Sequence, residues 1–162
     1  MRNVFFSFHY KDIIRVSQIR NHYITKPDRK SAGYLDWADW EQVKRQGDAN
    51  IRRWINDQLN GTTVTAVLIG METHQRPWVI YEIEESVKRG NGLLGIFLNN
   101  IPDFQGRTSW MPGPNPFAKV YVKGLWGNTP LSNIVSTYDW KNNDGYNNFA
   151  NWVEAAAKKA GR

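Results

Sequence analysis

The sequence contains no cysteine in its 162 residues, which excludes disulfide bonds, zinc–thiolate sites and cysteine nucleophiles. Long apolar stretches are missing as well. No run approaches the ~20 apolar residues of a membrane-spanning helix, and the first residues lack the apolar length of a signal peptide. We therefore expect a cytoplasmic protein with no membrane partner and, at this length, a single domain over residues 1–162.

Motifs that bind nucleotides, metals or phosphoryl groups are also absent. The sequence has neither a GxxxxGK[ST] phosphate-binding loop nor a GxGxxG turn. Its three histidines, His9, His22 and His74, lack the paired spacing of metal ligands, so we expect no metal site. A phosphate-accepting receiver domain needs acidic residues after its first and central strands, but residues 7–9 read Ser-Phe-His and residues 70–72 read Gly-Met-Glu. Phosphoryl acceptance is therefore disfavoured.

Positive charge and aromatic side chains are in excess. The formal net charge is +6, and the chain carries eight tryptophans and seven tyrosines. The lysines and arginines occur in small scattered groups, and no basic helix with interleaved aromatic residues is present, so we expect no nucleic-acid partner. An aromatic excess suits either a heavily packed core or a pocket that stacks on flat rings.

Strand and helix patterns alternate along most of the chain, with no internal repeat. This alternation predicts an α/β fold with a flavodoxin-like parallel sheet of about five strands and helices on both faces. The Pro- and Gly-rich residues 99–118 are expected to form a long loop whose role the sequence leaves open. We expect strands at residues 4–8, 33–37 (an edge strand), 62–69, 93–98 and 133–140, a brief pairing at 120–122, and helices at 12–23, 49–59 (capped by Asp48), 78–89 and 146–160.

One glutamate on the helix at 78–89 differs from its neighbours. Glu84 and Glu85 each have a cation four residues later, Lys88 and Arg89, and we expect both to form surface ion pairs. Glu82 has no cation at that spacing. Helical side chains lean toward the N-terminus, so Glu82 should face the crevice beyond the carboxyl ends of the strands, where open α/β sheets bind ligands. A plainer explanation is a glutamate placed near the positive end of the helix dipole.

An unpaired carboxylate among aromatic rings suits chemistry in which positive charge develops on a sugar ring. Cleavage of an N-glycosidic bond through an oxocarbenium-like state is one such reaction. At ~4 Å from that charge, with an effective dielectric constant of ~20, a carboxylate supplies ~4 kcal/mol. A nucleoside transferase that uses the carboxylate as a nucleophile is a second reaction of this kind.

Several segments resemble a known family over nearly the whole chain. They are residues 4–12 (VFFSFHYKD), 33–36 (GYLD), 40–41 (WE), 64–70 (VTAVLIG) and, above all, 76–83 (RPWVIYEI), followed by 113–117 (GPNPF), 138–140 (YDW) and 144–146 (DGY). The chain resembles the TIR-like family and, more narrowly, the ThsB proteins of bacterial Thoeris anti-phage defence.

The resemblance implies a TIR-like domain that acts as an NAD+ glycohydrolase or ADP-ribosyl cyclase, with NAD+ as its substrate and no cofactor. It implies that Glu82 is catalytic and binds the ribose next to the nicotinamide, and that Phe8, His9, Tyr10 and Asp36 line the substrate pocket. Trp78, as an aromatic ring near this edge, is expected to bind substrate by stacking on a base or on the nicotinamide. The product would be a cyclic ADP-ribose isomer or a related nucleotide, a second messenger for a separate effector protein. Because TIR enzymes often complete their sites across subunits, a homo-oligomer is also expected.

The alternative function is a non-catalytic TIR-type interaction module, since many such domains serve as assembly surfaces. It predicts that a change at Glu82 leaves the biological effect intact, whereas changes on surface helices abolish it. The sequence leaves open which product is made, what triggers the enzyme and how many copies assemble.

Overall fold

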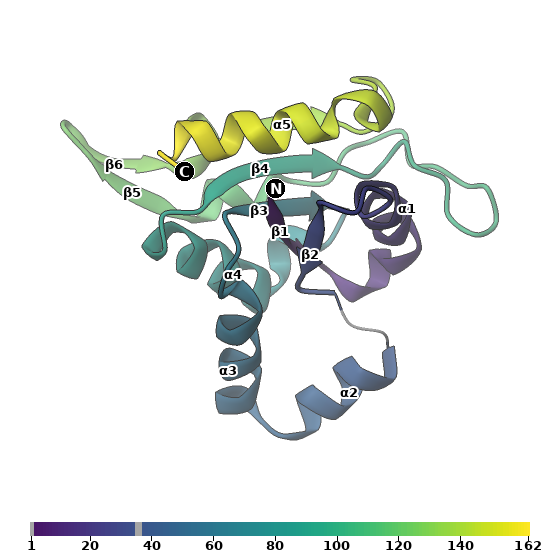
Figure 1. Ribbon diagram of the computed structural model, residues 1–162, viewed down its shortest axis with the longest axis horizontal. Helices are drawn as coiled ribbons and strands as arrows, with labels where there is room; N and C mark the ends of the chain where they lie inside the picture. The colour runs from purple at the N-terminus through teal and green to yellow at the C-terminus, as the bar shows by residue number, and fades with distance from the viewer. Residues whose placement is uncertain (1, 35–36) are drawn as a thin grey trace.

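The computed structural model describes residues 2–34 and 37–162 and shows an α/β fold built on one parallel sheet (Figure 1). Five strands lie in the order β2-β1-β3-β4-β7, and each neighbouring pair is parallel. The predicted fold class is therefore confirmed. The strands are β1 (Asn3–Phe8), β2 (Lys30–Ala32), β3 (Val64–Ile69), β4 (Gly92–Phe97) and β7 (Ser136–Asp139).

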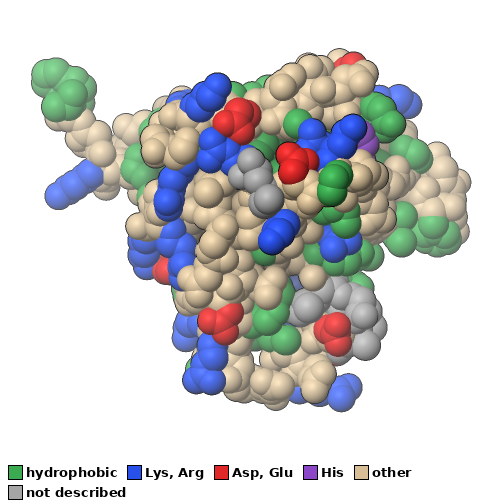
Figure 2. All heavy atoms as spheres, viewed as in Figure 1, with side chains coloured by type: hydrophobic (Ala, Val, Ile, Leu, Met, Phe, Trp, Pro, Cys, Tyr) green, Lys and Arg blue, Asp and Glu red, His purple; other side chains and the backbone are tan. Residues whose placement is uncertain are grey.

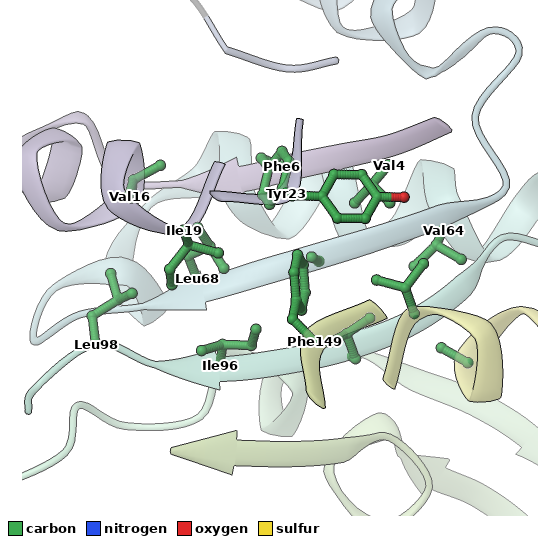
Figure 3. Close-up of a cluster of buried hydrophobic side chains, with 14 of the residues drawn as sticks. Val4, Phe6, Val16, Ile19, Tyr23, Val64, Leu68, Ile96, Leu98 and Phe149 are labelled. Carbon is green, nitrogen blue, oxygen red and sulfur yellow. The ribbon is translucent and has the colours of Figure 1, made fainter. Parts of the chain in front are cut away.

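Helices cover both faces of this sheet, as predicted. On one face α1 (Ile13–Tyr23) and α5 (Gly145–Lys159) enclose a core that contains Phe6 and Phe149 (Figure 3). On the other face α3 (Asp48–Leu59) packs on Phe5, and α4 (Pro77–Lys88) packs on Val67. Side chains alternate between faces along a strand, so β1 contributes to both cores. No helix in the described part of the chain is long and apolar enough to cross a bilayer.

Two predictions in the N-terminal half are wrong. The edge strand expected at 33–37 is instead β2, three residues earlier, and residue 37 begins an unpredicted helix, α2 (Trp37–Arg45). The short strand β2 pairs with β1 through its backbone, so its Lys-Ser-Ala sequence carries no apolar signal. Asp48 is not a cap either: it is the first residue of α3 and makes no capping hydrogen bond, while Gly47 precedes the helix with a φ of 90°. Glycine adopts such a φ without strain.

The C-terminal half also departs from the prediction. The last strand is shorter than 133–140, because residues 131–133 form a 3₁₀ turn, η4 (Leu131–Asn133), that buries Leu131. The loop at 99–118 ends in a second such turn, η3 (Pro116–Lys119), which buries Phe117. The brief pairing expected at 120–122 is an antiparallel hairpin of β5 (Tyr121–Gly124) and β6 (Gly127–Pro130), separate from the main sheet.

The surface ion pairs of α4 differ from the expected ones. The Lys88 ammonium lies 2.7 Å from the carboxylate of Glu85, three residues earlier, not beside Glu84. Arg89 donates to the side chain of Asn60 on the neighbouring helix end at 2.7 Å. Both predicted pairings are therefore wrong, because the side chains reach closer partners.

Gly92 allows α5 to approach the start of β4. A Cβ atom added at Gly92 would lie 2.4 Å from the backbone oxygen of Ala156 in α5. We therefore expect Gly92→Ala to force the helix and strand apart and to lower the free energy of unfolding by about 1–3 kcal/mol. Urea denaturation measures this change. Gly124→Ala, on the exposed hairpin with its nearest atoms at 3.2 Å, is the matched control, and equal losses in both variants would contradict the prediction.

Candidate active site

A narrow cavity opens where β1 ends, under the first turns of α4. Its interior is small, about 50 Å³. The walls come from β1 and the 3₁₀ turn η1 (Tyr10–Asp12) that follows it, from the end of β2, and from α2, α3 and α4. The residues that line the cavity are Phe6, Phe8, His9, Tyr10, Gly33, Trp40, Trp54, Arg76, Trp78, Val79 and Glu82.

Glu82 is the carboxylate of this cavity. Pro77 begins α4, and the buried face of the helix consists of Val79, Glu82, Ile83 and Ser86. These positions are three and four apart and form one stripe toward the sheet. Glu82 therefore occupies a core position, and the residue is only 8% exposed. The apolar pattern of the sequence alone predicts a buried face of Val79, Ile80, Ile83 and Val87; the structure has the polar residues Glu82 and Ser86 in place of Ile80 and Val87.

The carboxylate of Glu82 is bound by a hydroxyl group. Ser7 of β1, itself fully buried, donates a hydrogen bond from Oγ to Oε2 of Glu82. Among the described residues no cation forms an ion pair with this carboxylate, and no charged group contributes to its pKa shift. Burial raises the pKa of Glu82 to about 8, and the hydrogen bond from Ser7 opposes the shift. At neutral pH the unliganded site therefore holds a protonated carboxyl group.

A buried pair of hydroxyl groups, those of Ser86 and Thr65, fixes the helix behind the carboxylate. Ser86, one turn after Glu82, donates from Oγ to the backbone oxygen of Glu82 at 2.7 Å, and its Oγ also lies 2.7 Å from Oγ1 of Thr65 on β3. Each buried hydroxyl thus has a partner, as buried polar groups require. These contacts attach α4 to two adjacent strands and hold Glu82 in register with Ser7.

Aromatic rings make up most of the remaining wall. Trp40 of α2 lies 5.9 Å from Trp54 of α3, and Trp78 lies edge-on to Tyr81 at 5.9 Å between ring centroids. The guanidinium of Arg52 lies 5.7 Å from the centre of the Trp78 ring. Such a wall excludes water and presents flat faces to a planar ligand.

Positive groups lie around the aromatic wall. Arg76, the residue before α4, lines the cavity and is exposed. Burial and the nearby Arg76 guanidinium lower the pKa of His9, which favours its neutral form. The arrangement therefore combines an acid at the inner end with a cation at the exposed side, and it suits a ligand with a positive ring and a negative tail.

The structure brings most of the predicted site residues into this one cavity: Phe8, His9, Tyr10, Trp78 and Glu82 all line it. Their roles in binding and catalysis stay predictions. Asp36 lies outside the described residues. Sequence reasoning missed Ser7, Trp40, Trp54 and Arg76; for Ser7 the available signal was a polar residue inside an otherwise apolar strand.

Comparison with known proteins agrees with this geometry. The chain matches the family described as Thoeris protein ThsB, TIR-like domain, over residues 5–103, a range that includes every residue lining the cavity. A protein of Bacillus cereus (strain MSX-D12), named "Putative cyclic ADP-D-ribose synthase ThsB1", is 36% identical over an alignment 190 positions long, which covers 94% of this chain and 98% of the relative. The chain belongs to the Thoeris ThsB family of TIR-like domains.

Proposed function

We propose that this chain cleaves the bond between nicotinamide and ribose in NAD+, with Glu82 as the catalytic carboxylate, and closes the ADP-ribosyl group into a cyclic ADP-ribose isomer. The observation that carries the proposal is the buried Glu82 carboxyl group, bound by Ser7 and enclosed by aromatic rings. The name of the relative, a cyclic ADP-D-ribose synthase, supports the same reaction class. The product would serve as a second messenger for a separate effector protein.

The Glu82 carboxylate stabilises the positive charge that develops on the ribose during cleavage. The nicotinamide ring of NAD+ is cationic, and its departure leaves positive charge on the ribose as an oxocarbenium-like state. A Glu82 carboxylate ~4 Å from that charge, at an effective dielectric constant of ~20, contributes ~4 kcal/mol. This corresponds to about a thousandfold in rate. The burial that makes ionisation costly also removes the water that would screen this attraction.

Substrate binding changes the proton on Glu82. In the unliganded cavity burial raises the pKa to about 8. A cationic ring next to the carboxyl group favours the ionised form and lowers that pKa. The proton is therefore released to solvent as the substrate enters, and the carboxylate is available as the glycosidic bond lengthens.

The cyclic product forms in two steps, cleavage of the glycosidic bond and internal attack on the anomeric carbon. The carbon–nitrogen bond breaks, and nicotinamide leaves as a neutral molecule with the electron pair of that bond. A nucleophilic atom of the same ADP-ribosyl cation, an adenine nitrogen or a hydroxyl oxygen, attacks the anomeric carbon; where a hydroxyl attacks, its proton passes to the Glu82 carboxylate. The aromatic wall favours this internal attack because it keeps competing water away from the cation.

The experiment is incubation of the purified protein with NAD+, with and without lysate of phage-infected cells, followed by mass spectrometry. We expect release of nicotinamide together with a product that has the mass of ADP-ribose less one water. Absence of nicotinamide release under both conditions would contradict the proposal and favour the interaction module.

Ser7 is expected to position the catalytic carboxylate. Loss of a hydrogen bond to a charged group costs about 1.5–3 kcal/mol, so Ser7→Ala should lower kcat/KM for nicotinamide release about ten- to a hundredfold. Because the Ser7 hydroxyl lowers the pKa of Glu82, the midpoint of the pH profile of kcat/KM should also move to higher pH. Rates measured across a pH series test both effects.

Ser86→Ala provides the control for this prediction. It also removes a buried hydroxyl group from α4, but Ser86 bonds the backbone of Glu82 and not its carboxylate. Its pH midpoint should stay where it is in the wild type. A pH profile that moves equally in both variants would mean that Ser7 acts only through packing.

A further inference from the structure

The cavity around Glu82 is too small to enclose a whole dinucleotide. Its interior measures about 50 Å³, whereas pockets that enclose a drug-sized ligand measure ~300–1,000 Å³. NAD+ consists of two nucleotides joined through a diphosphate, so at most its nicotinamide end can enter. The diphosphate and the adenosine half therefore lie at or beyond the mouth of the cavity.

Arg76 lies at that mouth. Among the described residues that line the cavity, it is the only exposed one and also the only lysine or arginine. Elsewhere lysines and arginines are spread over the surface and alternate with acidic side chains (Figure 2). The position of Arg76 at the cavity, and not a general basic patch, therefore sets this cation apart.

The guanidinium of Arg76 is available to a ligand. Glu72, whose pKa is lowered chiefly by Lys11 and to a smaller extent by Arg76, is bound by Lys11 at 2.8 Å. In the described part of the chain Arg76 forms no ion pair, and its side chain makes no capping hydrogen bond to α4. Its backbone is fixed, because its N–H donates to the Thr73 oxygen at 3.1 Å and its oxygen accepts from the Ile80 N–H at 3.2 Å. A rigid backbone thus carries an uncommitted charge.

The acid and the cation of the cavity are separated from each other. No charged group contributes to the pKa shift of Glu82, so the Arg76 guanidinium lies too far away to pair with that carboxyl group. In NAD+ the nicotinamide and the diphosphate are attached to opposite ends of one ribose. A substrate whose ribose lies at Glu82 therefore directs its diphosphate toward the mouth and Arg76.

We propose that Arg76 binds the diphosphate of the substrate and thereby selects dinucleotides over nicotinamide nucleosides, an inference that rests on the proposed cleavage of NAD+. A guanidinium presents a planar fork of N–H donors that matches two oxygens of a phosphate group. The diphosphate is not part of the bond that breaks, and its charge stays the same during cleavage. Arg76 therefore binds the ground state and the transition state about equally, and its loss raises KM more than it lowers kcat.

Two substrates that differ in phosphate test this assignment. Nicotinamide riboside has the cationic ring and the ribose of NAD+ but no phosphate. With the purified full chain, Arg76→Gln should lower kcat/KM for nicotinamide release from NAD+ about ten- to a hundredfold, mainly through KM, and leave the value for nicotinamide riboside unchanged. Arg76→Lys, which keeps the charge but loses the fork, should lie between Arg76→Gln and the wild type.

Arg53→Gln is the matched control. It removes the same charge from an exposed position on α3 that does not line the cavity, so it should behave like the wild type toward both substrates. Equal losses for NAD+ and nicotinamide riboside in Arg76→Gln would mean that Arg76 acts through the cavity wall, for example through His9, and would overturn the proposal. Unchanged values for NAD+ would also overturn it.

Binding of ADP-ribose separates this inference from the proposed function. ADP-ribose carries the diphosphate but no nicotinamide, and its binding, measured by titration calorimetry, requires no turnover. We expect Arg76→Gln to bind it at least about tenfold more weakly than the wild type and Arg53→Gln do, even if no nicotinamide is released from NAD+. A wild type that does not bind ADP-ribose, or an equal affinity in Arg76→Gln, would overturn the role of Arg76, whereas nicotinamide release alone decides the proposed function. Unchanged melting temperatures show that each variant is folded.

Discussion

Glu82→Gln is expected to abolish nicotinamide release, with a loss of about a thousandfold or more in kcat/KM. The substitution keeps the size and shape of the side chain and an oxygen that accepts from Ser7, but it removes the negative charge at every pH. The loss follows from the ~4 kcal/mol that a buried carboxylate contributes beside an oxocarbenium-like state. Chromatographic measurement of nicotinamide formed from NAD+ gives the rate of each variant.

Glu84→Gln is the matched control for this substitution. It makes the same chemical change on the same helix, but Glu84 is exposed and does not line the cavity. Its rate should equal that of the wild type. Equal turnover by Glu82→Gln and the wild type would show that Glu82 is not the catalytic carboxylate, even though it lies in the cavity.

The same residue is expected to make folding stability fall as pH rises. In the unfolded chain Glu82 loses its proton near its ordinary pKa of 4.5, whereas in the folded protein burial raises the pKa to about 8. Between these values the folded state binds more protons than the unfolded state, so the free energy of unfolding decreases with pH. The contribution of Glu82 to the free energy of unfolding is fully present below pH 4.5 and is lost as the pH rises through about 8. At ~1.4 kcal/mol per pKa unit, the loss is on the order of a few kcal/mol.

Urea denaturation of the wild type and Glu82→Gln at pH 5, 7 and 9 measures this effect. Glutamine cannot ionise, so the variant should gain stability relative to the wild type as the pH rises. Asp12, whose pKa burial also raises, contributes to both proteins and cancels in the difference. A difference that does not change with pH would show that the carboxyl group of Glu82 is solvated in the folded protein. Together the two predictions describe a group that lowers stability in order to serve the reaction.

The sheet could be predicted because its strands are buried on both faces. Residues 64–69 are all buried, and a strand of this kind must be a continuous apolar run. The edge of the sheet could not be predicted in this way. The three residues of β2 are held by backbone pairing with β1, and such pairing leaves no pattern in the side chains. Local propensity therefore failed where a contact between distant segments decided the structure.

The site could be predicted only in part, because most of its contacts join segments that are far apart in the sequence. Glu82 stood out because no cation follows at helical spacing, and the structure places it in a cavity. Ser7 lies 75 positions away in sequence, and Trp40 and Trp54 reach the cavity only because α2 and α3 pack against each other. Neither relation leaves a short-range signal.

The sequence by itself determined the alternation of strands and helices, the central buried strand, and a glutamate without a counter-ion on the helix that follows it. Those features depend on the period and burial of neighbouring residues, which are local properties. Only the tertiary structure decided that a serine from the first strand binds this glutamate, that tryptophans from two other helices enclose it, and that burial raises its pKa. Pairing, enclosure and desolvation are properties of groups brought together from distant parts of the chain, so they exist only once it has folded.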